Sequence, residues 1–481
     1  MAKKKMGILK KIFLGILGLL VLAVAVIGIL ILKMNTDKNK YMGHGFKYMN
    51  GYSTTDFTGY HVYDGEKLVT LDHEASLRIE NEADMPILDG AEACYPVYSA
   101  LAKAVYKDID KIEADYHTRA TEYWNTRGKG DNYEMMTVYL YNGKYVSFSN
   151  TLEAYYRMIN KEVDMVIAAR PSANQKEEAT RKLEQIITVP IGREAFIFFV
   201  EEDNPVDNLT SEQIRQIYHG DITNWKQVGG KNEKIIAFQR PEDSGSQVMM
   251  KWFMGDVSLK EPKKIEYIGG MGDLISKVAE YNNERGALGY TFKYFLTGLN
   301  QEQHVKILSV DGIEPTAENI KNGSYPATVN LICAYLASNQ KETVKQMIDF
   351  MLSDDGQYII EKTGYAPLAD RNAAPVIENE LPDVTVQTYM SEDEKWTLKI
   401  YRQETDTVIA ELYDSSNYCK GNLYYYPDSG DDPPYRLDSF AGYYDIGFRY
   451  DDENDSYTKS GSYGNVRIEP PRNGTVFRRS S

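Results

Sequence analysis

The sequence predicts an α/β fold that is preceded by one transmembrane helix and followed by a small β-rich domain. Between residues 85 and 375, short apolar runs alternate with amphipathic stretches, which favours a largely parallel sheet covered by helices. An uncharged apolar run over residues 12–32 is long enough to cross a bilayer as a helix. After residue 375 the chain turns to short, tyrosine-rich strand patterns broken by turn residues.

The N-terminal 84 residues divide into three predicted parts. Residues 1–11 carry lysine at positions 3, 4, 5, 10 and 11, which places this tail in the cytoplasm and the bulk of the chain outside a single-pass cell-membrane anchor at residues 12–32. A cleaved signal peptide is the alternative, although the apolar run is longer than a signal core and no small-residue cleavage site follows it. Residues 33–84 are expected to be an extracellular spacer with a hairpin at Asp64 and Gly65.

Residues 85–375 carry the α/β pattern. The predicted strands are residues 85–90, 163–169, 287–291 and 327–335. The predicted helices are residues 95–105, 154–160 and 343–353. A further helix begins after a Thr210 or Ser211 cap and ends at Gly220. Residues 376–481 are then assigned to a separate tyrosine-rich β domain of ordinary domain size.

A polar loop at residues 240–247 has the parts of an anion site. Ser244 and Ser246 offer hydroxyl donors, and Gly245 lets the backbone approach a ligand. The helix that follows presents unpaired N–H groups and the positive end of its dipole. Arg240 adds a planar fork of donors. The loop therefore predicts an anion cradle at a helix N-terminus, whereas the bland alternative is a simple turn and cap.

The sequence leading into this loop carries a family resemblance. Residues 190–200, 204–206 and 209–230 run in order into residue 240. Over about residues 85–370 the chain resembles the phosphate-binding proteins that deliver substrate to ABC transporters, in the type 2 periplasmic-binding-protein class. The resemblance implies two α/β lobes joined by crossing strands, with the ligand held in the cleft between them. It also implies phosphate or a similar small oxyanion as ligand and ABC transporter membrane subunits as partners.

The resemblance assigns ligand-binding positions in both lobes. In the second lobe they are Arg240, Ser244, Gly245 and Ser246, with Ser246 where the family commonly has Thr. In the first lobe they are Thr151, Gly90, Ala91 and Glu92.

Two positions depart from the family pattern. Glu92 stands where a Ser or Thr hydroxyl is usual, and Ala169 stands where many members have an Asp that accepts the phosphate proton. A carboxylate about 4 Å from an anion costs on the order of 4 kcal/mol at an effective dielectric near 20. Glu92 could therefore face solvent, could be protonated and donate a hydrogen bond, or could signal that the ligand is no longer phosphate.

Charge, residue spacing and missing motifs argue against nucleic-acid binding, metal binding and catalysis. The net charge of −16 argues against nucleic acid as a partner. The six histidines show no metal-ligand spacing, and no cofactor is expected. The chain shows no nucleophile elbow, metal-ligand set or glycine-rich nucleotide loop, so we do not expect an enzyme. Cys94, Cys333 and Cys419 are expected to be buried free thiols, with a Cys94–Cys333 disulfide as the alternative.

Two functions follow from these patterns. The first is a membrane-tethered solute-binding protein for phosphate or a related oxyanion, which feeds an ABC importer. The second is a degenerate binding module that acts as a surface sensor or cell-envelope interaction protein without transport. The loop at residues 240–247 favours the first, whereas Glu92, Ala169 and the added β domain favour the second.

Overall fold

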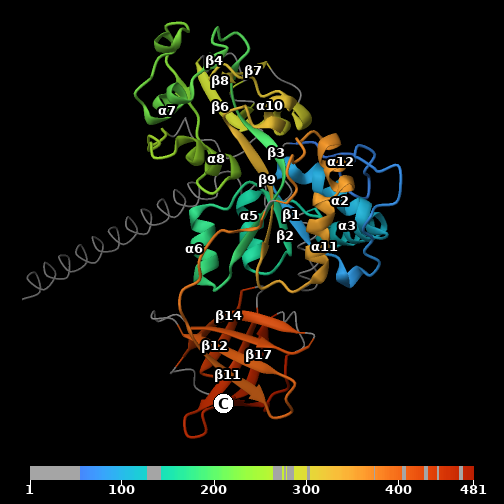
Figure 1. Cartoon of the computed structure of the whole chain (residues 1–481). Helices are drawn as coiled ribbons and strands as arrows, with labels where there is room; N and C mark the ends of the chain where they lie inside the picture. The colour runs from blue at the N-terminus through green and yellow to red at the C-terminus, as the bar shows by residue number, and fades with distance from the viewer. Residues whose placement is uncertain are drawn as a thin grey trace, which may run out of the picture.

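The computed structural model describes residues 55–126, 142–263, 274–275, 278, 286–300, 304–372, 374–402, 408–415, 417–426, 432–440, 444–464 and 470–480. These residues form two α/β lobes and a C-terminal barrel, arranged in a row with lobe 1 in the middle (Figure 1). Each of the three units has its own buried hydrophobic cluster. The predicted membrane helix at residues 12–32 lies outside the described residues. Within the described part of the chain, no helix combines the length and apolar character needed to span a bilayer.

Lobe 1 combines the first part of the α/β region with the segments that return after lobe 2. Its strands are β1 (Leu88–Gly90), β2 (Met165–Ala168) and β10 (Val376–Ile377), together with the first part of β3 (Ile186–Glu201) and the last part of β9 (Thr328–Leu336). Its helices are α2 (Tyr95–Val105), α3 (Ile109–Asn125), α5 (Thr151–Ile159), α6 (Ala173–Arg181), α11 (Glu342–Leu352) and α12 (Asp354–Thr363). The short 3-10 helices η2 (Glu82–Asp84) and η3 (Glu92–Cys94) flank β1.

Lobe 2 is built from the residues between β3 and β9. Its strands are β4 (Asn208–Leu209), β5 (Ile236–Ala237), β6 (Ala287–Phe292), β7 (Val305–Ile307) and β8 (Ser309–Val310). Its α-helices are α7 (Ser211–His219), α8 (Gly245–Met254) and α10 (Ala317–Asn322). A 3-10 helix, η4 (Trp225–Val228), and a π-helix, η6 (Phe295–Leu299), complete it.

The main sheet continues through both lobes in the order β1-β2-β9-β3-β6-β5. The β1–β2 and β5–β6 pairs are parallel, but β9 is antiparallel to both β2 and β3, and β3 is antiparallel to β6. The expectation of a largely parallel sheet is therefore wrong. Because β3 leaves lobe 1 and β9 returns to it, the two strands cross between the lobes in opposite directions.

Local sequence signals placed several helices well. Thr210 caps α7 in a capping box with Gln213, and Gly220 ends the helix in the left-handed conformation, as predicted. α2 spans the predicted residues 95–105. α5 begins at Thr151, three residues before the predicted start at 154, because the side chain of Asn150 accepts a hydrogen bond from the Glu153 N–H and caps the helix there.

The described part of the predicted spacer belongs to lobe 1. Residues 58–64 form turns, so the expected hairpin at Asp64 and Gly65 is wrong. Phe57, Val62, Leu68 and Ile79 are buried in the hydrophobic cluster of lobe 1. The apolar residues that suggested alternating strands are thus anchors that hold the segment on the lobe.

The C-terminal β domain is a closed barrel of antiparallel neighbours in chain order. Its strands are β11 (Thr385–Ser391), β12 (Thr397–Arg402), β13 (Val408–Tyr413), β14 (Tyr418–Tyr425), β15 (Tyr435–Ser439), β16 (Tyr444–Asp451), β17 (Ser456–Gly464) and β18 (Val476–Arg479). Closure removes free strand edges. The predicted domain boundary at 375 lies slightly too early, because β10 at Val376–Ile377 still pairs with β3.

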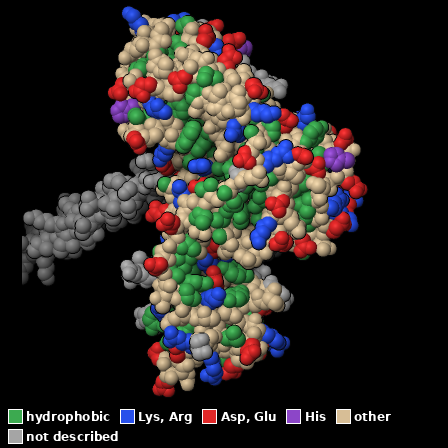
Figure 2. Space-filling model, viewed as in Figure 1, with side chains coloured by type: hydrophobic (Ala, Val, Ile, Leu, Met, Phe, Trp, Pro, Cys, Tyr) green, Lys and Arg blue, Asp and Glu red, His purple; other side chains and the backbone are tan. Residues whose placement is uncertain are grey.

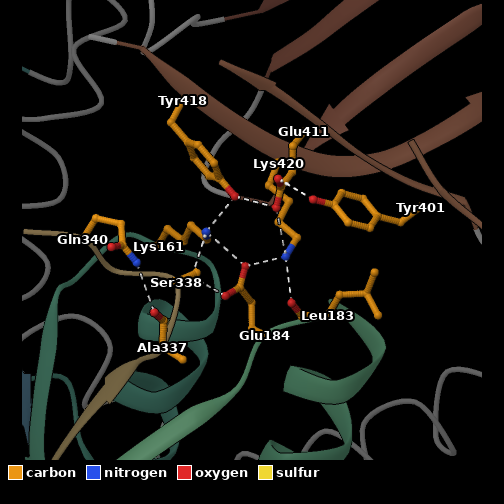
Figure 3. Close-up of polar contacts among 10 residues, drawn as sticks. All are labelled: Lys161, Leu183, Glu184, Ala337, Ser338, Gln340, Tyr401, Glu411, Tyr418 and Lys420. Carbon is orange, nitrogen blue, oxygen red and sulfur yellow. Dashed lines mark hydrogen bonds and ion pairs between the residues drawn. The ribbon is translucent and has the colours of Figure 1, made fainter. Parts of the chain in front are cut away.

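A buried charge cluster joins the barrel to lobe 1 (Figure 3). Lys420 of β14 donates to the Leu183 carbonyl at 2.8 Å and to Glu184 at 2.7 Å. Glu184 also pairs with Lys161 at 3.0 Å, and Glu411 of β13 lies 3.4 Å from Lys420. Glu184 is fully buried, and burial lowers the pKa of Lys161. Two lysines and two glutamates therefore compensate one another inside the interface between the domains.

Candidate functional site

The N-termini of two helices meet where the lobes contact each other. Thr151 is the first residue of α5 in lobe 1, and Gly245 is the first residue of α8 in lobe 2. A Cβ placed on Gly245 would lie 2.7 Å from Thr151 Oγ1 and 3.4 Å from the Ala169 Cβ. This approach requires glycine, and it brings two predicted site residues together across the cleft. Two positive dipole ends with unpaired first-turn N–H groups then converge, which favours an anion.

Arg240 and Ser246 add buried polar groups on the lobe 2 side. Arg240 is 7% exposed, and its backbone N–H donates to Gln247 Oε1 at 3.0 Å and to the Tyr290 hydroxyl at 3.1 Å. These bonds fix the loop that carries the guanidinium. The Ser246 hydroxyl is fully buried and has no hydrogen-bond partner among the described residues. A buried hydroxyl without a partner costs about 1–3 kcal/mol, so this site has an unmet capacity for a hydrogen bond.

Ser244 has a structural task. Its side chain is the N-cap of α8 and accepts a hydrogen bond from the Gln247 N–H at 3.4 Å. The loop it begins is also held across the cleft, because Asn174 Nδ2 at the start of α6 donates to both carboxylate oxygens of Asp243, at 3.1 and 3.2 Å. The two lobes are therefore in direct polar contact beside the predicted site.

The backbone of the first loop of lobe 1 is hydrogen-bonded within the lobe. The Gly90 N–H donates to Asp89 Oδ1 at 2.7 Å and the Ala91 N–H to the Ile167 carbonyl at 3.0 Å. Ligand contact by Gly90 and Ala91 stays a prediction. Glu92 is 6% exposed, so the alternative in which it faces solvent is wrong.

A buried ion pair that sequence reasoning missed holds this side of the cleft. Asp89, fully buried, pairs with Arg157 of α5 and accepts hydrogen bonds from the Ser149 N–H at 2.8 Å and hydroxyl at 2.7 Å. It thereby ties β1 to the loop before α5 and to α5 itself. The signal available in the sequence was Asp89, a charged residue at the end of a buried strand, but its partner Arg157 lies 68 positions away.

The backbone before α5 is strained. Asn150, next to Ser149, has a φ of 121°, a conformation that a non-glycine residue adopts only under constraint.

A small cavity lies beneath the meeting point of the helices. Its volume is about 20 Å³. The lining comes from both loops of lobe 1 and from the crossing strands: Ala91, Ala93, Cys94, Ala168, Ala169, Glu194, Phe292, Asn330, Leu331 and Tyr365. Ala169, the position at which the resemblance expects an Asp, borders both this cavity and Gly245.

The positive charge available to an anion comes from groups at the site itself and not from a large positive surface patch. Acidic and basic side chains are interspersed over the face of the molecule seen in Figure 2. An anion would therefore be attracted by the helix termini and Arg240 rather than by a broad field. Among the described residues, no group of acidic, histidine or cysteine side chains has a metal-binding arrangement. Cys94, Cys333 and Cys419 are buried free thiols.

Comparison with known proteins identifies relatives of the two-lobed region. The profile of the PBP superfamily domain matches residues 90–355. Phosphate-binding protein PstS of Borreliella burgdorferi is 30% identical over 216 residues, which cover 43% of this chain and 74% of that protein. PstS of Bacillus subtilis is 31% identical over 176 residues, 36% of this chain and 54% of that protein. Protein SphX of Synechococcus elongatus is 23% identical over 305 residues, 59% of this chain and 84% of that protein.

Proposed function

Since the chain belongs to the PBP superfamily, with phosphate-binding proteins named PstS among its relatives, we propose that it binds phosphate or a related oxyanion between its two lobes. The observation that carries the proposal is the meeting of the α5 and α8 N-termini at Thr151 and Gly245, beside the buried Arg240. The relatives do not favour the alternative of a non-transport surface module.

We propose further that the protein is tethered to the cell membrane through residues 12–32 and delivers its ligand to the membrane subunits of an ABC importer. The apolar run with its lysine-rich flank supports the tether. The importer as partner rests on the family resemblance. The groups that meet at the site, Thr151, Gly245 and Arg240, are suited to holding an anion, which supports a binding role.

Calorimetric titration of the full chain with phosphate and with sulfate tests the proposed ligand. We expect Arg240→Ala to weaken oxyanion binding by roughly 2–5 kcal/mol, because the anion would remain buried without its cation. Arg119→Ala is the matched control, since Arg119 is a half-exposed α3 residue paired with Asp115. Wild-type affinity in Arg240→Ala would show that the anion is not bound at this site.

A further inference from the structure

Glu194 stands at the point where the crossing strand β3 passes from one lobe to the other. Arg193, Glu194 and Ala195 pair with β9, and from Phe196 onward β3 pairs with β6. A change in the angle between the lobes has to be absorbed where the strands cross. Glu194 therefore occupies a hinge position.

The Glu194 carboxyl bonds to the β3 backbone and to the segment that follows β6. One oxygen accepts a hydrogen bond from the Ala195 N–H on β3 at 2.7 Å, and the other accepts one from the Tyr294 N–H, just beyond β6, at 3.2 Å. The side chain is 5% exposed. Ala195 belongs to the hydrophobic cluster of lobe 2 and Tyr294 to that of lobe 1, so the carboxyl bridges the two clusters.

Glu194 also lines the cavity beneath the site. That cavity, of about 20 Å³, is walled by lobe 1 residues Ala91 and Ala169 together with Glu194 of β3 and Phe292 of β6. A cavity needs at least about 10–15 Å³ to hold a water molecule, so this one has room for about one and leaves Glu194 with little solvent in the closed lobes. Opening the lobes would part these walls and hydrate the Glu194 carboxyl.

The groups around Glu194 leave burial as the dominant influence on its charge. Burial raises the pKa of Glu194 to about 7, against the opposing effects of the Ala195 and Tyr294 N–H groups and of Lys293. Besides Lys293, the titratable groups that face Glu194 are Cys94, Tyr294 and Tyr365, which are neutral near pH 7 because burial raises the pKa of Cys94 to about 12 and raises those of the two tyrosines further.

We propose that Glu194 is a proton-linked hinge residue, whose carboxylate is hydrated in the open cleft and takes a proton from solvent when the two lobes close over it. The step forms one O–H bond on the Glu194 carboxyl and consumes up to one solvent proton per closure. This inference rests on the proposed function only where phosphate is used as the probe. It makes closure, and with it ligand retention, sensitive to pH.

The direction of the effect follows from proton linkage. The proposal takes hydration in the open cleft to return the pKa of Glu194 to its ordinary value of 4.5, whereas burial holds it at about 7 in the closed state, so closure takes up a proton between these values. Closure therefore weakens as pH rises from about 4.5 to about 7 and is insensitive to this group above that range. Each unit by which the pKa of Glu194 differs between the open and closed states changes the equilibrium constant for closure by at most about tenfold.

A distance measurement on the ligand-free full chain tests the hinge without any assumption about the ligand. Fluorophores are placed at Glu177→Cys on α6 and Glu212→Cys on α7, two exposed positions, while the native cysteines are buried. We expect the closed fraction to fall several-fold between pH 5 and 7.5. Glu194→Gln should abolish this dependence, and Glu202→Gln, an exposed neighbour, should retain it. If the closed fraction of the wild-type protein does not change with pH, the proposal is overturned. This result depends on the wild-type protein alone, so it holds even if Glu194→Gln does not fold.

Phosphate titration of the same proteins separates the two proposals. The ionisation of phosphate itself is common to all variants and cancels in the ratio of wild-type to Glu194→Gln affinity. That ratio should fall as pH rises from 5 to 7, and calorimetry in buffers of different ionisation enthalpy should show up to one extra proton taken up by wild type. Equal pH profiles overturn the hinge while leaving phosphate binding intact. A pH-dependent distance without phosphate binding instead supports the hinge and removes the proposed function.

Discussion

Glu92 is the residue on which the sequence-based alternatives for the ligand differ. It is buried at 6% exposure, next to the two residues of the first loop whose amides are engaged within lobe 1. Two of the sequence-based alternatives therefore remain: a protonated Glu92 that donates a hydrogen bond, or a ligand other than phosphate. Both differ from the family pattern, in which a hydroxyl stands at this position.

Replacing Glu92 by Thr distinguishes these alternatives. If the carboxylate is charged beside the anion, Glu92→Thr should tighten phosphate binding by up to about 4 kcal/mol, the repulsion expected at 4 Å. If Glu92 is protonated, the gain should be small at low pH and grow as pH rises. Calorimetry of both proteins at several pH values gives the answer, with the exposed Glu74→Thr as control. Equal affinities at every pH would remove Glu92 from the site.

At the level of elements, the candidate site is a contact between two helix ends. Sequence signals located both ends: Ser244 caps α8, and α5 was placed within three residues of its true start. Their meeting could not be read from the sequence, because it depends on how the lobes are set by the crossing strands. The antiparallel crossing, the Asp89–Arg157 pair and the closure of the barrel are likewise tertiary features, fixed by partners far apart in the chain.

The close approach of Gly245 to Thr151 can be tested by adding one methyl group. Gly245→Ala would place a Cβ 2.7 Å from Thr151 Oγ1 and so push the helix ends apart. We expect oxyanion affinity to fall by about 1–3 kcal/mol, as for overpacking. The thermal stability of the ligand-free protein should hold or rise, because alanine favours a helix over glycine. Undiminished affinity would mean that the two termini need not touch for binding.

At the level of the whole molecule, the barrel and lobe 1 are joined by buried charges. Removing one charge leaves the others uncompensated, so Lys420→Met should destabilise the protein by about 3–5 kcal/mol. The exposed Lys395→Met on the same barrel should change the unfolding free energy by less than about 1 kcal/mol. Chemical denaturation of both variants measures the difference. Equal destabilisation would show that the cluster does not hold the domains together.

The membrane tether belongs to the same scale and stays a prediction. Protease added to intact cells that express the full chain should degrade the two lobes and the barrel, because the lysine-rich tail orients residues 12–32 with the rest outside. Mass spectrometry of the mature protein should find residues 1–11 still attached. A mature chain that begins after residue 32, or full protection from external protease, would contradict the tether.

Two helices of lobe 1 that begin near the site, α5 and α6, also lead toward the barrel. α5 begins at Thr151 and leads to Lys161, and α6 begins beside the Asn174–Asp243 contact and leads to the Leu183 carbonyl and Glu184 that Lys420 binds. In Figure 1 the barrel lies at the end of lobe 1 that is away from lobe 2. The barrel is therefore attached to lobe 1. A partner that bound the barrel would fix the orientation of lobe 1, and closing the cleft would then move lobe 2 relative to that partner.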